Sequence, residues 1–155
     1  MTYALNELES LLRKAAVGAG FPVGHAVAIA AAGVWLARRR FPVCEIISRA
    51  LAVGMRESLA KPDGPGLEYK AVRAAADGPA AIDLLLAGSA DVAITLSDVD
   101  EPVLLVGLAG VVAKAHGVGV HLHAADVEVA IGEGTDITPI ECSLPRDCTV
   151  VMRLC

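Results

Sequence analysis

Residues 90–123 read ADVAITLSDVDEPVLLVGLAGVVAKAHGVGVHLH and contain the signals of a strand, a helix and a second strand, in that order. Ala90–Leu96 alternates apolar and polar side chains and holds β-branched residues, which is typical of a strand. Pro102–His116 is an apolar run with proline at its first turn, basic residues in its last turn and glycine directly after it, which indicates a helix. The stretch therefore predicts a right-handed parallel crossover that ends in the strand Val118–His123.

Segments on both sides of this unit extend the predicted sheet. A tight turn at Ala124–Asp126 separates Val118–His123 from the next strand, so the two predict an antiparallel hairpin. A strand and a helix upstream of the unit would make a second crossover. The remaining segments are interpreted as the strands Leu67–Arg73, Val127–Ile131 and Cys148–Leu154 and the helix Pro79–Ala87. The expected result is a mixed β-sheet with helices packed against it.

The first sixty residues predict three helices, because apolar residues recur at helical spacing between glycine and proline breaks. One follows the capping-box pattern of Asn6 and Glu9, and the others are Val23–Ala37 and Val43–Leu59. Lys61–Gly66 (KPDGPG) is the clearest linker. We expect a single domain over residues 1–155, with a helical part at 1–60, a linker at 61–66 and a sheet-containing part at 67–155. The fold class is α+β or α/β.

Composition excludes several classes of protein. The chain has 155 residues, 55% of them hydrophobic, so it is not disordered. A net charge of −5 excludes a non-specific binder of nucleic acid or of anionic membranes, because both need clustered positive charge. The longest apolar runs, Val23–Ala37 and Pro102–Ala113, are shorter than the roughly 18–20 residues that cross a bilayer.

The four cysteines predict free thiols rather than disulfides or a zinc site. The N-terminus carries acidic residues where a secretory signal would be basic and then apolar, so we expect a cytoplasmic protein with reduced cysteines. The last three cysteines are separated by wider intervals than a zinc knuckle uses. The cysteines are Cys44, Cys142, Cys148 and Cys155.

The first candidate site is the acidic turn between the strand and the helix of the crossover. It lies at the carboxyl end of a predicted strand, where open α/β sheets bind ligands. Asp98, Asp100 and Glu101 argue against a phosphate site, which uses backbone amides, but their oxygens suit a divalent cation or an amine. The alternative interpretation is that Asp100 and Glu101 stabilise the positive end of the following helix.

The second candidate site is the pair His121 and His123. Period two places both imidazoles on one face of a strand, about 7 Å apart. In a parallel crossover His123 would lie at the same sheet end as Asp98 and Asp100, where a His/Asp cluster could bind a metal or transfer protons. The alternative is a solvated or packing face. No third and fourth ligand follow at readable spacing, so we assign no metal and no cofactor.

Patterns of alanine, leucine and glycine over residues 5–123 resemble an uncharacterised bacterial family that is catalogued only as a domain of unknown function. The stretches that carry the resemblance are Leu5–Glu9, Arg13–Gly20, the alanine-rich helix that ends in Trp35 and Leu36, Gly78-Pro79 with Asp83, and Pro102–Leu105 leading into Ala113 and Gly117. The resemblance implies no activity, substrate or catalytic residue.

Two functions are consistent with these observations. The favoured one is a non-catalytic binding or accessory subunit that forms a homo-oligomer, with an unidentified small molecule or protein as its partner. It rests on the apolar excess, on helices suited to close packing, and on the absence of GxSxG, Walker, HExxH, CxxC and GxGxxG motifs. Its interface would include Val23–Ala37 or Val43–Leu59. The alternative is a small-molecule enzyme or metal-dependent binder that uses Asp98, Asp100, His121 and His123.

Overall fold

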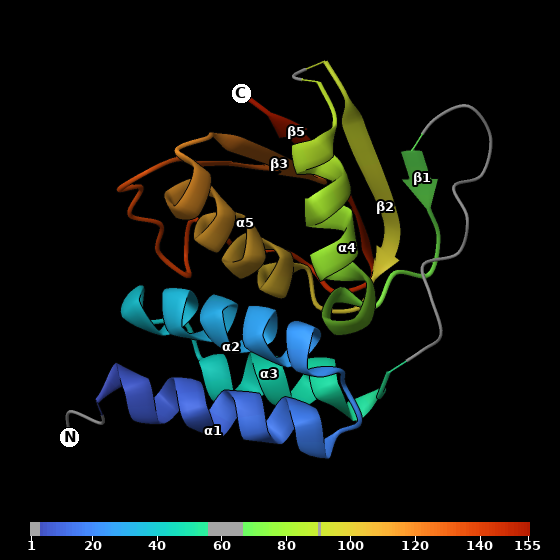
Figure 1. The fold of residues 1–155 in the computed structure, drawn as a ribbon. Coiled ribbons are helices and arrows are strands. Elements are labelled where there is room, and N and C mark those ends of the chain that lie inside the picture. The colour runs from blue at the N-terminus through green and yellow to red at the C-terminus, as the bar shows by residue number, and fades with distance from the viewer. Residues whose placement is uncertain (1–3, 56–66, 90) are drawn as a thin grey trace.

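A computed structural model describes residues 4–55, 67–89 and 91–155 and shows an α+β fold (Figure 1). Helices α1, α2 and α3 come first, and strands and two further helices follow. The helices are α1 (Leu5–Gly18), α2 (Val23–Arg38), α3 (Val43–Ala52), α4 (Ala74–Ala87) and α5 (Pro102–His116). The strands are β1 (Leu67–Tyr69), β2 (Ala93–Val99), β3 (Val120–Ala124), β4 (Val127–Ile131) and β5 (Cys148–Leu154).

The five strands form one mixed sheet in the order β1-β2-β5-β3-β4. β1 and β2 pair in parallel across α4, and β3 and β4 form the predicted antiparallel hairpin. β5 pairs antiparallel with both β2 and β3, so β2 and β3 run parallel to each other. The crossover through α5 therefore has the predicted relative direction, but the last strand of the chain lies between its two strands.

Three layers follow from this topology (Figure 1). Helices α4 and α5 cover one face of the sheet. Helices α2 and α3 pack on them from the other side, and α1 packs on α2. Helix α5 is thus enclosed by the sheet on one side and by α2 on the other. This position explains why α5 is apolar on all sides, since a helix buried all round has no polar face. The apolar excess of the sequence is largely used inside the chain.

Glycines allow α2 and α5 to approach closely. A Cβ at Gly107 would lie 3.0 Å from the carbonyl oxygen of Ala32, and a Cβ at Gly110 would overlap the indole ring of Trp35. The ring of Trp35 is almost fully buried against that glycine. Close packing of the two central helices therefore depends on the missing side chain at Gly110.

Several predicted boundaries differ from the structure. Helix α1 begins at Leu5 with Ala4 as its N-cap, so Asn6 is not the capping residue. Helix α3 ends at Ala52, and residues 56–59 of its predicted range lie outside the described residues, as do the linker 61–66 and Ala90. β1 is shorter than predicted. Helix α4 begins five residues before Pro79, because two carboxylates accept hydrogen bonds from the backbone N–H groups at its start.

Among the described helices, none combines the length and the apolar character that crossing a bilayer requires.

Candidate functional site

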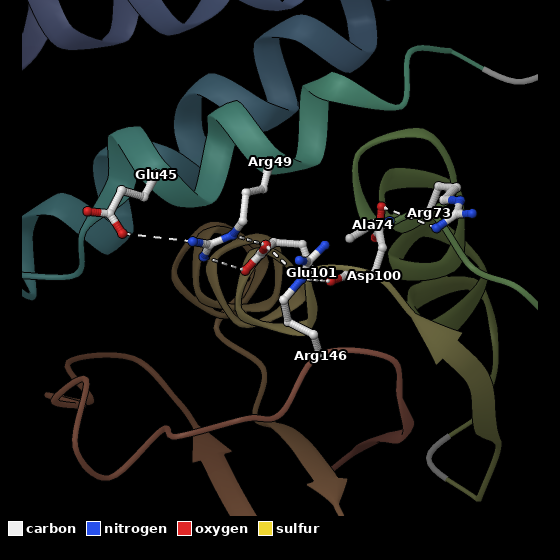
Figure 2. Close-up of polar contacts among 7 residues, drawn as sticks. All are labelled: Glu45, Arg49, Arg73, Ala74, Asp100, Glu101 and Arg146. Carbon is white, nitrogen blue, oxygen red and sulfur yellow. Dashed lines mark hydrogen bonds and ion pairs between the residues drawn. The ribbon is translucent and has the colours of Figure 1, made fainter.

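Two buried carboxylates and three arginines meet where β2 ends and α5 begins (Figure 2). Asp100 and Glu101 supply the carboxylates, and both are almost fully buried. The arginines come from three separate parts of the chain: Arg49 from α3, Arg73 from the start of α4, and Arg146 from the loop before β5. We call these five residues the arginine–carboxylate cluster. It lies at the carboxyl ends of the parallel strands β1 and β2.

Glu101 is held mainly by Arg49. Arg49 Nε donates to Glu101 Oε2 at 2.8 Å, and Nη2 donates to Oε1 at 3.2 Å, so the contact is bidentate. This hydrogen bond raises the pKa of Arg49. Arg146 Nε lies 3.9 Å from Glu101 Oε2 and donates to the carbonyl oxygen of Asp100 at 3.1 Å. The charge of Glu101 is therefore compensated from two sides.

Asp100 joins the start of α5 to the start of α4. Its Oδ1 accepts a hydrogen bond of 2.8 Å from the backbone N–H of Ala74. Its Oδ2 lies 4.0 Å from Arg73 Nη1 but has no hydrogen-bond partner among the described residues, and the buried Arg73 Nε has none either. Buried polar atoms of this kind are usually satisfied by an ordered water.

The backbone near the cluster adopts unusual conformations. Ala71, Asp98 and Asp147 have φ angles of 52°, 53° and 55°, in the left-handed region that L-residues rarely enter. Ala71 and Asp147 lie in loops at this edge of the sheet, and Asp98 lies near the end of β2, where the register of β2 with β5 shifts. Hydrogen bonds from Asp147 N to the carbonyl oxygen of Val99 (2.8 Å) and from Asp100 N to that of Val72 (3.2 Å) hold these loops together. Strained residues of this type gather at sites that the surrounding structure over-determines.

The hydrogen bonds of the cluster join separate elements of the chain. The oxygens of Glu101 face two guanidinium groups, and Asp100 Oδ1 accepts a hydrogen bond at the start of α4. The arginines keep between 32% and 55% of their side-chain surface exposed. Their outer N–H groups are therefore the part of the cluster that solvent can reach.

The structure places the five candidate residues in three different environments. Asp100 and Glu101 belong to the cluster, whereas Asp98 is exposed near the C-terminal end of β2. His121 and His123 lie on the face of the sheet that none of the described helices covers. There they line a hollow of about 250 Å³ with Glu128, Val151 and Arg153 and with none of the three acidic candidates.

Sequence reasoning missed the three arginines of the cluster and Asp77. Arg49 lies 52 residues before Glu101, and Arg146 lies at a similar separation after it, so no local motif marks them. The available signal was indirect: two adjacent acids before an apolar helix are buried only with cations beside them. Asp77 accepts a hydrogen bond of 2.8 Å from the backbone N–H of Arg73, and this bond caps the start of α4. The sequence analysis missed it because it predicted that the helix begins at Pro79.

No group of three or more His, Cys, Asp or Glu side chains within the described ranges is arranged to hold a metal ion. Residues 3–96 match the model of a family described as "Protein of unknown function (DUF3726)". Neither the comparison with curated proteins nor the comparison with solved structures gives a significant match.

Proposed function

Because the chain belongs to the DUF3726 family, whose function is unknown, we propose a function from the geometry: a non-catalytic binding or accessory subunit that works as a homo-oligomer. The commitment of Asp100 and Glu101 to arginines and to a helix start supports a structural role for these acids. The observation that carries the homo-oligomer is the outer surface of α1 next to α3. It replaces the interface on Val23–Ala37 that the sequence suggested, because α2 packs between α1 and α5.

The outer surface of α1 presents one large apolar side chain between two opposite charges. Leu11 is 61% exposed. Glu7 and Lys14, both exposed, lie one turn before it and one turn after it on the same side of the helix. With Leu8 and Cys44 these residues line an open groove of about 710 Å³ between α1 and α3. Burial of Leu11 against a partner would remove its apolar surface from water, which is favourable.

The occupant that fits this groove is a second copy of the chain. Glu7 and Lys14 are seven residues apart, so two α1 helices related by a two-fold axis and running antiparallel would each place Glu7 opposite the other copy's Lys14. The two Leu11 side chains would then meet near the axis. A surface with both charges at matched distances from its centre is complementary to itself.

Charge reversal tests this arrangement. Glu7→Lys and Lys14→Glu should each weaken self-association, because each places two like-charge pairs across the axis. Mixing the two variants should restore association as a heterodimer, since every pair is then attractive. The double variant Glu7→Lys/Lys14→Glu should self-associate as the unmodified chain does. Sedimentation analysis of each sample measures these states.

Arg13→Glu is the matched control, because it changes the charge of α1 by the same amount at an exposed position that does not line the groove. It should leave self-association unchanged. Equal behaviour of Lys14→Glu and Arg13→Glu, or a mixture of the two reversed variants that stays monomeric, would contradict the proposed interface.

A second candidate function rests on the hollow beside His121 and His123. Here the chain would bind a small molecule, and this replaces the wider alternative in which the same histidines share a pocket with Asp98 and Asp100. Calorimetric titration with Zn²⁺ of the unmodified chain and of the variants His121→Ala and His123→Ala tests whether this binding depends on a metal. Binding that both substitutions remove would support it, and binding that both variants retain would contradict it.

We also propose that the subunit works in the bacterial cytoplasm. All four cysteines are free thiols. Free thiols are usual in a reducing compartment and unusual in exported proteins of this size.

A further inference from the structure

An open cleft lies at the C-terminal ends of α2 and α5, away from the arginine–carboxylate cluster and from the groove on α1. Two hollows of about 510 and 380 Å³ share Trp35, Arg38 and Lys114 as walls. The loop 132–136 after β4 borders the larger hollow, and apolar side chains of α2 and α5 form most of the smaller one. Cavities of this size bind small organic molecules in other proteins.

Arg39 fixes the loop that borders the cleft. Its guanidinium group stacks on the ring of Trp35 at 3.6 Å from the centroid. Its Nε and Nη2 donate to the carbonyl oxygen of Thr135 at 3.1 and 2.7 Å, and Nη1 donates to the carbonyl oxygen of Trp35 at 3.2 Å. Thr135 Oγ1 in turn accepts a 2.7 Å hydrogen bond from the N–H of Gly132. The rim of the cleft is therefore pre-organised.

Side chains of opposite charge line the same cleft but do not form ion pairs with one another. Arg38 and Lys114 are exposed cations, and Glu9 and Glu133 are exposed acids. Within the part of the chain that the structure describes, none of the four makes a hydrogen bond or an ion pair. Cations at helix C-termini complement the helix dipole, which accounts for Arg38 and Lys114. It does not account for the acids that line the same hollows, Glu9 of α1 in the smaller one and Glu133 and Asp136 of the loop in the larger one.

We propose that this cleft binds a small zwitterion with an apolar body, of the class of an aliphatic α-amino acid. The carboxylate would contact Arg38 and Lys114, the ammonium group would contact Glu133, and the aliphatic part would pack on the apolar wall next to Trp35. Two arginines of the Arg38-Arg39-Arg40 run would then have different roles, because Arg39 fixes the loop and Arg38 would contact the ligand. This site goes beyond the proposed self-association, whose residues do not line it.

Calorimetric titration with L-leucine tests the proposal, with 4-methylpentanoate and 3-methylbutylamine as probes that keep only one of the two charges. Leucine should bind saturably, and each single-charge probe should bind at least about tenfold more weakly, the loss expected when a charge-assisted contact is removed. Trp35 is the only tryptophan of the chain, so a parallel change of intrinsic fluorescence locates the binding event at the cleft.

Substitutions assign the contacts. Arg38→Gln and Glu133→Gln should each weaken leucine binding by at least about tenfold. Arg40→Gln is the matched control, because it lies in the same basic run but does not line either hollow, and it should leave binding unchanged. Three results would overturn the proposal: no heat of leucine binding up to roughly 20 mM, equal affinity for leucine and 4-methylpentanoate, or equal affinity in Arg38→Gln and Arg40→Gln.

Discussion

Replacing Arg49 with alanine should destabilise the protein by about 2 kcal/mol. The change removes both hydrogen bonds that Arg49 makes to Glu101 and leaves that carboxylate, 2% exposed, with Arg146 at 3.9 Å as its nearest cation. Breaking a fully buried pair in this way costs about 3–5 kcal/mol. The Arg49 side chain is 41% exposed, so water can enter and partly solvate Glu101, which lowers the expected loss.

Urea unfolding followed by Trp35 fluorescence measures this loss, and a double-mutant cycle isolates the pair. Glu101→Gln removes the charge, so Arg49→Ala in that background should cost roughly 1 kcal/mol less than in the unmodified chain. Glu45→Gln is the control, because Glu45 is an exposed partner of Arg49 at 3.8 Å and should contribute at most about 0.5 kcal/mol. A loss below about 0.5 kcal/mol for Arg49→Ala, with no coupling to Glu101, would refute the structural role of the cluster.

Two further predictions concern the core and the thiols. Gly110→Ala should lower the free energy of unfolding by about 2–3 kcal/mol, because the new methyl group overlaps the ring of Trp35. Thermal unfolding measures this loss. Gly24→Ala is the control, because it lies at a helical position with open space around it, and it should be neutral or stabilising. Burial raises the pKa of Cys142 to about 11 from an ordinary value of 9.0, because it favours the neutral thiol. The neutral thiol therefore contributes fully to stability below pH 9, and this contribution is lost as the pH rises towards 11. At pH 8 iodoacetamide should therefore alkylate the exposed Cys44 and spare Cys142, and mass spectrometry of the peptides would contradict this if both react equally.

Local punctuation in the sequence predicted the sheet-forming half well. Proline at the first turn and glycine after the last one gave the bounds of α5, Pro102–His116, and the alternation of Val127–Ile131 gave β4. These signals depend on neighbouring residues only. The insertion of β5 between β2 and β3 depends on a long-range pairing, for which the sequence holds no local signal.

The candidate site was predictable only in part, for a related reason. The acidic turn could be located from the sequence, but the hydrogen bonds of its acids could not. Asp100 accepts from the backbone N–H of Ala74 at the start of α4, and Glu101, which makes no side-chain cap on α5, accepts from Arg49. The cations beside Glu101 could not be located from the sequence, because Arg49 and Arg146 reach Glu101 only through tertiary packing. The histidines were placed on one strand face, but which face the helices cover is decided by the layers and not by the strand itself.

The central claim is that the chain associates with itself through α1. Native mass spectrometry of the unmodified chain and of Leu11→Glu, at the same micromolar concentration, tests it most directly. We predict an even-numbered oligomer for the unmodified chain and a monomer for Leu11→Glu, because a charge would then lie at the centre of the contact. A monomer of the unmodified chain at high micromolar concentration, or an oligomer that Leu11→Glu leaves intact, would contradict the account.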